Sequence, residues 1–252
     1  MLKDFTRDDW LSILNIPESR IPSALLLRGT RNLRSNYEKH AAFFSDVVEI
    51  GSPNGIFEDI LIGEYQGADM GYASVYGDAM ASEVTHLFGA LGTRLVVQTG
   101  CCGALGDGIL PGDIVCATSA RCGEGASQYY TPGVKDISAS PDLIARVPSS
   151  VGEITVHKGA IRTTSALLAE GMDEVMEWRD QGCIAADMET ASTFAVAEYF
   201  GMRRLSLLFA FDNPCLGDHI LMIGDEEKSA RRASGEQAMI DLALAIIKAS
   251  AA

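Results

Sequence analysis

Residues 183–214, CIAADMETASTFAVAEYFGMRRLSLLFAFDNP, contain a strand, a helix and a second strand, with an acidic side chain after each strand. Apolar residues recur at helical spacing after Glu189, and Gly201 marks the end of that helix. Residues 205–211 form a nearly unbroken apolar run, which is typical of a parallel strand buried on both faces. Because ligands of open α/β sheets bind beyond the carboxyl ends of the strands, Glu189 and Asp212 are predicted site residues.

The alternation of strands and helices extends through most of the chain. Apolar runs at 24–28, 94–97, 113–117 and 154–162 predict buried strands, and residues 77–91, 172–181 and 226–249 predict helices. Strands expected at 47–50, 56–65 and 70–76 suggest an antiparallel or mixed part of the sheet. We therefore expect an α/β fold of three α/β/α layers around a central mixed, largely parallel β-sheet. It forms a single domain over residues 1–252, with residues 1–22 as a helical lead-in.

Composition excludes several functional classes. The 252 residues include 20 Lys and Arg against 34 Asp and Glu, a formal charge of −14, which argues against nucleic acid or an anionic membrane as partner. We find no apolar stretch of signal-peptide or membrane-spanning length, so a cytoplasmic location is expected. The six cysteines form no C-x-x-C pair, which predicts free thiols and no metal site.

Two other strand ends are rich in glycine. The first delivers Gly29, Arg31 and Arg34 to the start of a helix, where backbone amides and guanidinium groups favour an anion. From spacing alone, solvated arginines on a first helical turn are an equally good interpretation. The second strand end, residues 98–104, is bracketed by glycines that either let the backbone approach a ligand or simply form a tight turn.

Three motifs together carry a family resemblance. GCCGAL at 100–105, GEGASQYY at 123–130 and ADMETASTFAVA at 186–197, followed by Asp212, resemble the nucleoside phosphorylase/nucleosidase superfamily, which includes hexameric purine nucleoside phosphorylases and uridine phosphorylases. The similarity runs in order from Gly29 to the last helix. It implies a pentosyltransferase of nucleoside catabolism or salvage. The enzyme would use inorganic phosphate as co-substrate, need no cofactor, and form a homo-oligomer built from dimers, up to a hexamer.

The resemblance assigns the sugar site to Glu189, Met188 and Met80. Glu189 is expected to accept hydrogen bonds from ribose hydroxyls, while Met188 packs on the sugar ring. Cleavage of an N-glycosidic bond builds positive charge on the sugar, so a carboxylate beside it helps most in the transition state. The alternative for Glu189 is an acid that stabilises a helix N-terminus by about 0.3–1 kcal/mol.

The resemblance also assigns a base site. Asp212 occupies the position of the acid that protonates purine N7, and uridine phosphorylases lack it, so a purine-type base is expected. Arg232 matches an arginine that assists this acid, although it also fits a surface charge. The other expected base-site residues are Gly103, Asp187, Leu167 and Leu168, the last two lying near the usual stacking aromatic. Stacking by Tyr129 or Tyr130 is the alternative.

The expected phosphate site departs from the family pattern. It comprises Gly29, Arg31, Arg34, Gln98 and Cys101, but the family carries an arginine where Gln98 stands and a serine or threonine where Cys101 stands. A neutral amide cannot replace a charged bidentate donor. A further arginine, lent by a neighbouring subunit in hexameric members, is replaced by residues 53–55.

These departures keep two alternatives open. In a hydrolytic nucleosidase water replaces phosphate, and a nucleoside-binding sensor would keep the pocket without the chemistry. The chain lacks the N-terminal glutamate motif of methylthioadenosine/adenosylhomocysteine nucleosidases, whereas GEGASQYY resembles the phosphorylase branch. Phosphorolysis is therefore the predicted reaction.

Overall fold

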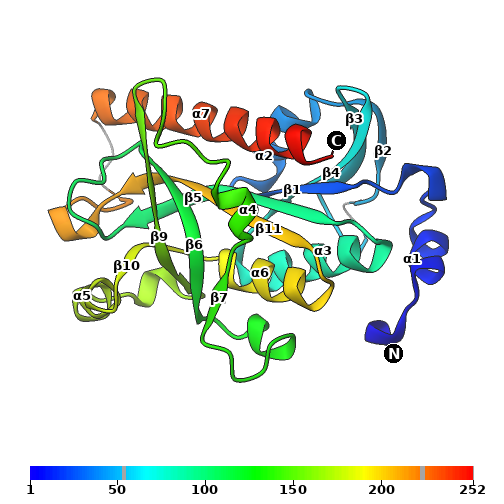
Figure 1. Ribbon diagram of the computed structural model, residues 1–252, viewed down its shortest axis with the longest axis horizontal. Helices are drawn as coiled ribbons and strands as arrows, with labels where there is room; N and C mark the ends of the chain where they lie inside the picture. The colour runs from blue at the N-terminus through cyan, green and yellow to red at the C-terminus, as the bar shows by residue number, and fades with distance from the viewer. Residues whose placement is uncertain (53–54, 222–224, 252) are drawn as a thin grey trace.

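A mixed β-sheet flanked by helices forms the centre of the computed structural model, which describes residues 1–52, 55–221 and 225–251 (Figure 1). The strands are β1 (Ala24–Gly29), β2 (Ser45–Glu49), β3 (Ile60–Tyr65), β4 (Ala68–Val75), β5 (Leu95–Ala104), β6 (Ile114–Gly123), β7 (Asp136–Ser138), β8 (Ser150–Val151), β9 (Ile154–Thr164), β10 (Cys183–Asp187) and β11 (Arg203–Asp212). The helices are α1 (Arg7–Leu14), α2 (Leu33–Ala41), α3 (Gly77–Leu91), α4 (Pro141–Ile144), α5 (Met172–Asp180), α6 (Thr190–Tyr199) and α7 (Glu226–Ala251). The expected α/β class with a mixed sheet is confirmed.

The strands follow the order β10-β9-β6-β11-β5-β1-β4-β3-β2, with β7 beside β6 and β8 beside β9. Neighbours are parallel from β11 through β5 and β1 to β4, and antiparallel from β4 to β3 and β2. The antiparallel region expected early in the chain is thus present. In addition, β10 pairs with β5, so β5, β11, β6, β9 and β10 close into a ring that the open-sheet expectation did not include.

Helices cover both faces of the sheet (Figure 1). The long helix α7 lies over one face with α2 and α4, where Tyr37, Leu143 and Met239 share a buried apolar cluster with strand residues. On the other face α3 and α6 pack against each other and against the sheet. Helix α6 is buried from Thr190 to Ala197, which accounts for its apolar sequence. The closed end of the sheet and these two layers set the position of the strand termini that form the site.

Strand β5 is longer than its sequence suggests. The glycine-rich residues 98–104 do not form a turn but continue the strand, and Gly103 pairs with both β10 and β11. Small side chains allow β5 to lie between these two strands. A Cβ on Gly103, for example, would crowd Asp212 Oδ1 at 3.2 Å. The predicted break at Gln98 was therefore wrong, and glycine here serves close packing of strands.

The remaining chain adds little to the site. The first 22 residues contain α1 and the short 3₁₀ helices η1 (Leu2–Asp4) and η2 (Glu18–Arg20).

Within the described residues, no helix combines the length and apolar character needed to cross a bilayer. All six cysteines are free thiols, as expected. The single-domain organisation stays a prediction.

Candidate active site

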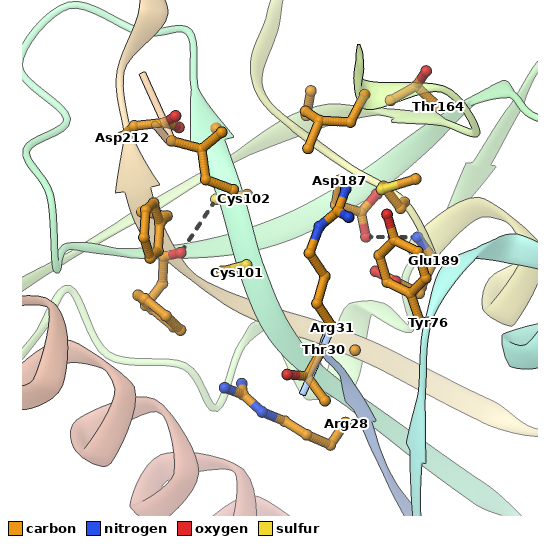
Figure 2. Close-up of a pocket in the computed structure, with 18 of the residues that line it drawn as sticks. Arg28, Thr30, Arg31, Tyr76, Cys101, Cys102, Thr164, Asp187, Glu189 and Asp212 are labelled. Atoms are coloured by element: carbon orange, nitrogen blue, oxygen red, sulfur yellow. Dashed lines mark hydrogen bonds between the residues drawn. The ribbon is translucent and has the colours of Figure 1, made fainter. Parts of the chain in front are cut away.

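A cavity of about 580 Å³ opens at the carboxyl ends of β1, β5, β10 and β11 (Figure 2). The lining comes from segments far apart in sequence, which the sheet topology brings together. Most residues expected at the site contribute to this lining: Gly29, Arg31, Cys101, Gly103, Leu167, Asp187, Met188, Glu189 and Asp212. Figure 2 shows Glu189 and Asp212 reaching the cavity from different elements, at two sides of it.

Glu189 lies between β10 and α6 and is only 5% exposed. Its carboxylate turns toward α3, where Oε1 accepts a hydrogen bond from the backbone N–H of Gly77 at 2.8 Å. Gly77 has a φ of +81°, a conformation that favours glycine and that aims this N–H at the carboxylate. Burial, with the nearby charge of Asp187, raises the pKa of Glu189 to about 8. The Glu189 side chain thus lines the cavity and does not cap the N-terminus of α6.

Asp187 holds the turn that carries Glu189. Its carboxylate accepts hydrogen bonds from the Thr163 hydroxyl at 2.7 Å, and from the Thr190 hydroxyl and amide at 2.6 and 2.9 Å. Gln98 Nε2 donates to the same carboxylate at 3.1 Å. Although Asp187 lines the cavity, both of its oxygens are engaged by protein donors, so its geometry suits positioning of the β10–α6 turn better than binding of a base.

Gln98 differs most from its expected role. It is fully buried, lies outside the cavity lining, and donates its amide hydrogen to Asp187. Gln98 therefore supports the β10–α6 turn from outside the cavity. The expected contribution of position 98 to a phosphate site has no geometric support. The cause is the alternation of β5, which directs Gln98 to the side of the sheet where Asp187 lies.

Arg28 is a cavity residue that sequence reasoning missed. Its side chain is almost fully buried at the end of β1, where Nη2 pairs with Glu236 and Nε lies 3.4 Å from Asn36 Oδ1. Nη1 is buried with no hydrogen-bond partner among the described residues. The available signal was an arginine inside the apolar run before Gly29, since burying a charged side chain is costly unless its donors find partners.

The two arginines predicted from the sequence separate in the structure. Arg31 lines the cavity, and its guanidinium lies 4.6 Å from the centroid of the Tyr76 ring (Figure 2). Arg34 instead points outward, where it pairs with Glu38 at 2.9 Å and Asp59 at 3.2 Å, and it does not line the cavity. The solvated alternative thus describes Arg34.

Asp212 is the last residue of β11 and is 7% exposed. Burial, followed by the charge of Asp218, raises the pKa of Asp212 to about 6, against an opposing effect of Arg232. Arg232 is buried rather than a surface charge. Its Nε donates to the Phe211 carbonyl at 2.6 Å, and its guanidinium lies 4.2 Å from the centroid of the Phe211 ring. Arg232 lies behind the cavity, beside the strand end that carries Asp212.

The end of the cavity near Asp212 is mainly apolar. Leu105, Leu167, Val175 and Trp178 line it together with Glu170, a carboxyl that the sequence analysis did not single out. Trp178, from α5, is one of four aromatic residues in the lining, with Tyr76, Phe209 and Phe211.

Three further expectations do not fit the cavity. Leu168 is 87% exposed, and Met80 packs against the apolar cluster below α3. Tyr129 is exposed, while Tyr130 contacts His86 and Tyr199. None of these side chains is part of the cavity lining. Of the segment 53–55, residues 53 and 54 lie outside the described residues.

The polar side chains that line the cavity indicate chemistry carried by carboxyl and guanidinium groups. Among the described residues, no group of three or more His, Cys, Asp or Glu side chains is arranged to hold a metal ion. Cys101 lines the cavity, but burial raises the pKa of its thiol to about 11, so the thiol stays protonated.

Comparisons with known proteins agree with the geometry. Residues 39–248 match the model of the phosphorylase superfamily. A guanosine phosphorylase from Halorubrum lacusprofundi is 30% identical over 67% of this chain and 71% of its own length. A DeoD-type purine nucleoside phosphorylase from Bacillus cereus is 27% identical over 90% of this chain and 94% of its own length.

The fold has a counterpart among solved structures. A uridine phosphorylase from Vibrio fischeri superposes with a TM-score of 0.78 over 93% of this chain and 94% of that chain, at 18% identity. That likeness confirms the fold, and the match over residues 39–248 confirms the resemblance found in the sequence. The chain therefore belongs to the phosphorylase superfamily.

Proposed function

We propose that the protein is a nucleoside phosphorylase that cleaves the N-glycosidic bond of a purine-type nucleoside with phosphate, giving the free base and a sugar 1-phosphate. The observation that carries the proposal is the presence of Glu189 and Asp212, two buried carboxyls with raised pKa values, in one cavity. The similarity to a guanosine phosphorylase and to a purine nucleoside phosphorylase supports a purine-type substrate.

Glu189 serves the sugar in this proposal. When an oxygen of phosphate approaches C1′, the C1′–N9 bond breaks and its electron pair leaves with the base, so positive charge grows on the ribose. The Glu189 carboxylate, fixed by Gly77, is stabilised by that charge and gains most in the transition state. Burial and the charge of Asp187 raise the pKa of Glu189, and the developing cation lowers it again.

Asp212 serves the departing base. A purine leaving as an anion is unstable, and proton transfer to N7 gives a neutral product. Burial keeps Asp212 partly protonated near pH 6, so it can donate this proton as the bond breaks. Arg232, held against Phe211, fixes the end of β11 and so the direction of the carboxyl.

Arg28 and Arg31 supply the positive charge for phosphate. Both line the cavity near Gly29 and Cys101, and Arg28 keeps one buried guanidinium nitrogen without a partner among the described residues. Phosphate oxygens accept hydrogen bonds from such donors. Arg28 thus takes the role of the arginine that position 98 lacks.

Hydrolysis is the second candidate, and the placement of Gln98 favours it. With position 98 engaged by Asp187, the site holds fewer phosphate donors than the resemblance implies. Water would then attack C1′, with the same roles for Glu189 and Asp212.

Base release from a panel of nucleosides, measured with and without phosphate in a phosphate-free buffer, distinguishes the candidates. We expect release to require phosphate and to yield sugar 1-phosphate in equal amount. Equal rates without phosphate contradict phosphorolysis and establish hydrolysis. Absence of release from every nucleoside contradicts both. The homo-oligomer stays a prediction.

A further inference from the structure

Glu170 is a half-buried acid for which the reaction above gives no role. It lies between the 3₁₀ helix η4 (Leu167–Ala169) and α5, and it lines the cavity. Its Oε1 atom is buried and has no hydrogen-bond partner among the residues that the structure describes. A buried acceptor without a donor is unfavourable, so its retention in a cavity indicates that a ligand supplies the donor.

Neighbouring acids on the same segment behave differently. Glu174 Oε2 accepts a hydrogen bond from the Gly171 amide at 3.0 Å, and Glu177 Oε1 accepts one from the Gln181 side chain at 2.8 Å. Both are exposed and stabilise α5 locally. Glu170 alone among these three lines the cavity.

The surroundings of Glu170 suit a flat heterocycle. Leu105, Leu167, Val175 and Trp178 provide apolar walls in the same part of the cavity. Desolvation by burial, followed by the negative charge of Asp212, raises the pKa of Glu170 to about 7. Both carboxyls line the same cavity. The base end of the cavity therefore offers two acidic groups to the polar edges of one ring system.

In the proposed reaction Asp212 already serves one edge of the purine, so we assign Glu170 to another. Asp212 is assigned to N7, which leaves the edge formed by N1, C2 and C6. In hypoxanthine N1 carries a hydrogen, and in guanine the 2-amino group adds another donor beside it. In adenine N1 is an acceptor. In its ionised form, which dominates above about pH 7, the Glu170 carboxylate only accepts hydrogen bonds. It then pairs with the first two bases and repels the N1 lone pair of the third.

We propose that Glu170 is a specificity-determining residue that accepts the N1–H of a 6-oxopurine, and the adjacent 2-amino group of guanine, so that guanosine and inosine are preferred over adenosine. This inference rests on the proposed function and names the substrate class of the same site. Sites built to hydrogen-bond a substrate N–H discriminate strongly because the analogue that lacks it leaves a buried polar group unpaired.

The test compares kcat/KM for guanosine, inosine and adenosine in the wild-type enzyme and in Glu170→Gln. We expect the wild type to prefer guanosine over adenosine at least about tenfold. We expect Glu170→Gln to reduce this ratio by about tenfold or more, because its amide can rotate to donate to adenine N1. The control is Glu177→Gln, which removes one carboxylate from the exposed side of α5 and should leave the ratio unchanged.

A second measurement keeps the inference independent of turnover. Calorimetric titration with hypoxanthine and with adenine, without phosphate, should show tighter binding of hypoxanthine to the wild type and loss of that preference in Glu170→Gln. An unchanged ratio in the variant, a wild type that prefers adenine, or no binding of either base overturns the role of Glu170. Absence of turnover with hypoxanthine still bound selectively overturns the phosphorylase proposal and leaves the base site established.

Discussion

Three acids of the β10–β11 region show how surroundings set the behaviour of a carboxyl group. Asp187 is surrounded by protein donors, Glu189 has one backbone donor, and Asp212 lies near a second acid, Asp218. All three line the cavity, but the side chain with satisfied oxygens positions a turn, and the other two keep oxygens that can serve a ligand. The number of nearby donors, which the sequence does not reveal, separates structural from reactive carboxyls.

Asp212→Asn should identify the proton donor. Asparagine keeps the shape of the side chain but has no proton to transfer, so kcat/KM for purine nucleosides should fall by about 10²–10⁴-fold. In the wild type, kcat/KM should decrease as pH rises through about 6, because the protonated acid is the active form. Steady-state rates across pH measure both effects.

A nucleoside already methylated at N7 provides the matching control for Asp212→Asn. Its base leaves without protonation, so the variant should cleave it nearly as fast as the wild type does. The exposed Asp107, which pairs with Arg179, offers a control substitution, Asp107→Asn. If Asp212→Asn slows both kinds of nucleoside equally, the group acts by positioning and the proton-donor role is wrong.

At the level of elements, close contact between strand ends builds the sugar site. A Cβ on Gly29, at the end of β1, would lie 2.8 Å from Glu189 Oε2. Gly29→Ala should therefore displace the carboxylate and lower kcat/KM by about tenfold or more, since a misplaced group loses its orientation. The change should leave the far-ultraviolet circular dichroism spectrum unaltered.

Gly125→Ala is the control for the Gly29 substitution. A Cβ there meets nothing within 4 Å, and the residue has a negative φ of −99°. Its kinetics should match those of the wild type. Wild-type kinetics in Gly29→Ala would show that Glu189 has room to move and that β1 does not fix it.

Elements also show what the sequence can and cannot predict. The apolar runs correctly indicated β10, α6 and β11 because burial dictates residue type there. The glycines of β5 were misread as a turn, since glycine permits both a turn and close strand packing. Arg28 and Glu170 were missed because only the fold shows that each lines the cavity with one buried polar atom that has no partner among the described residues. Gln98 was misplaced for the same reason, as its partner Asp187 is far away in sequence.

For the whole molecule, the cavity contains carboxyl groups whose ionised form is less favourable in the folded protein than in the unfolded chain. Glu189 has a pKa of about 8 when folded, against a value of about 4.3 expected in the unfolded chain. Between these pH values the folded state binds more protons than the unfolded state does. The free energy of unfolding therefore falls as pH rises from about 4.3 toward 8. Burial of Glu189 at the cavity thus lowers the stability of the molecule as the pH rises toward 8.

Glu189→Gln should remove this dependence. The variant should lose activity, yet its free energy of unfolding relative to the wild type should increase between pH 5 and pH 8 by on the order of 1–3 kcal/mol. Urea unfolding at several pH values measures the difference, and the effect of the formal charge of −14 largely cancels because it is nearly common to both proteins. Glu177→Gln, which removes an exposed carboxylate, should show a constant difference. A constant difference for Glu189→Gln as well would mean that Glu189 ionises normally in the folded protein and that burial does not control its charge.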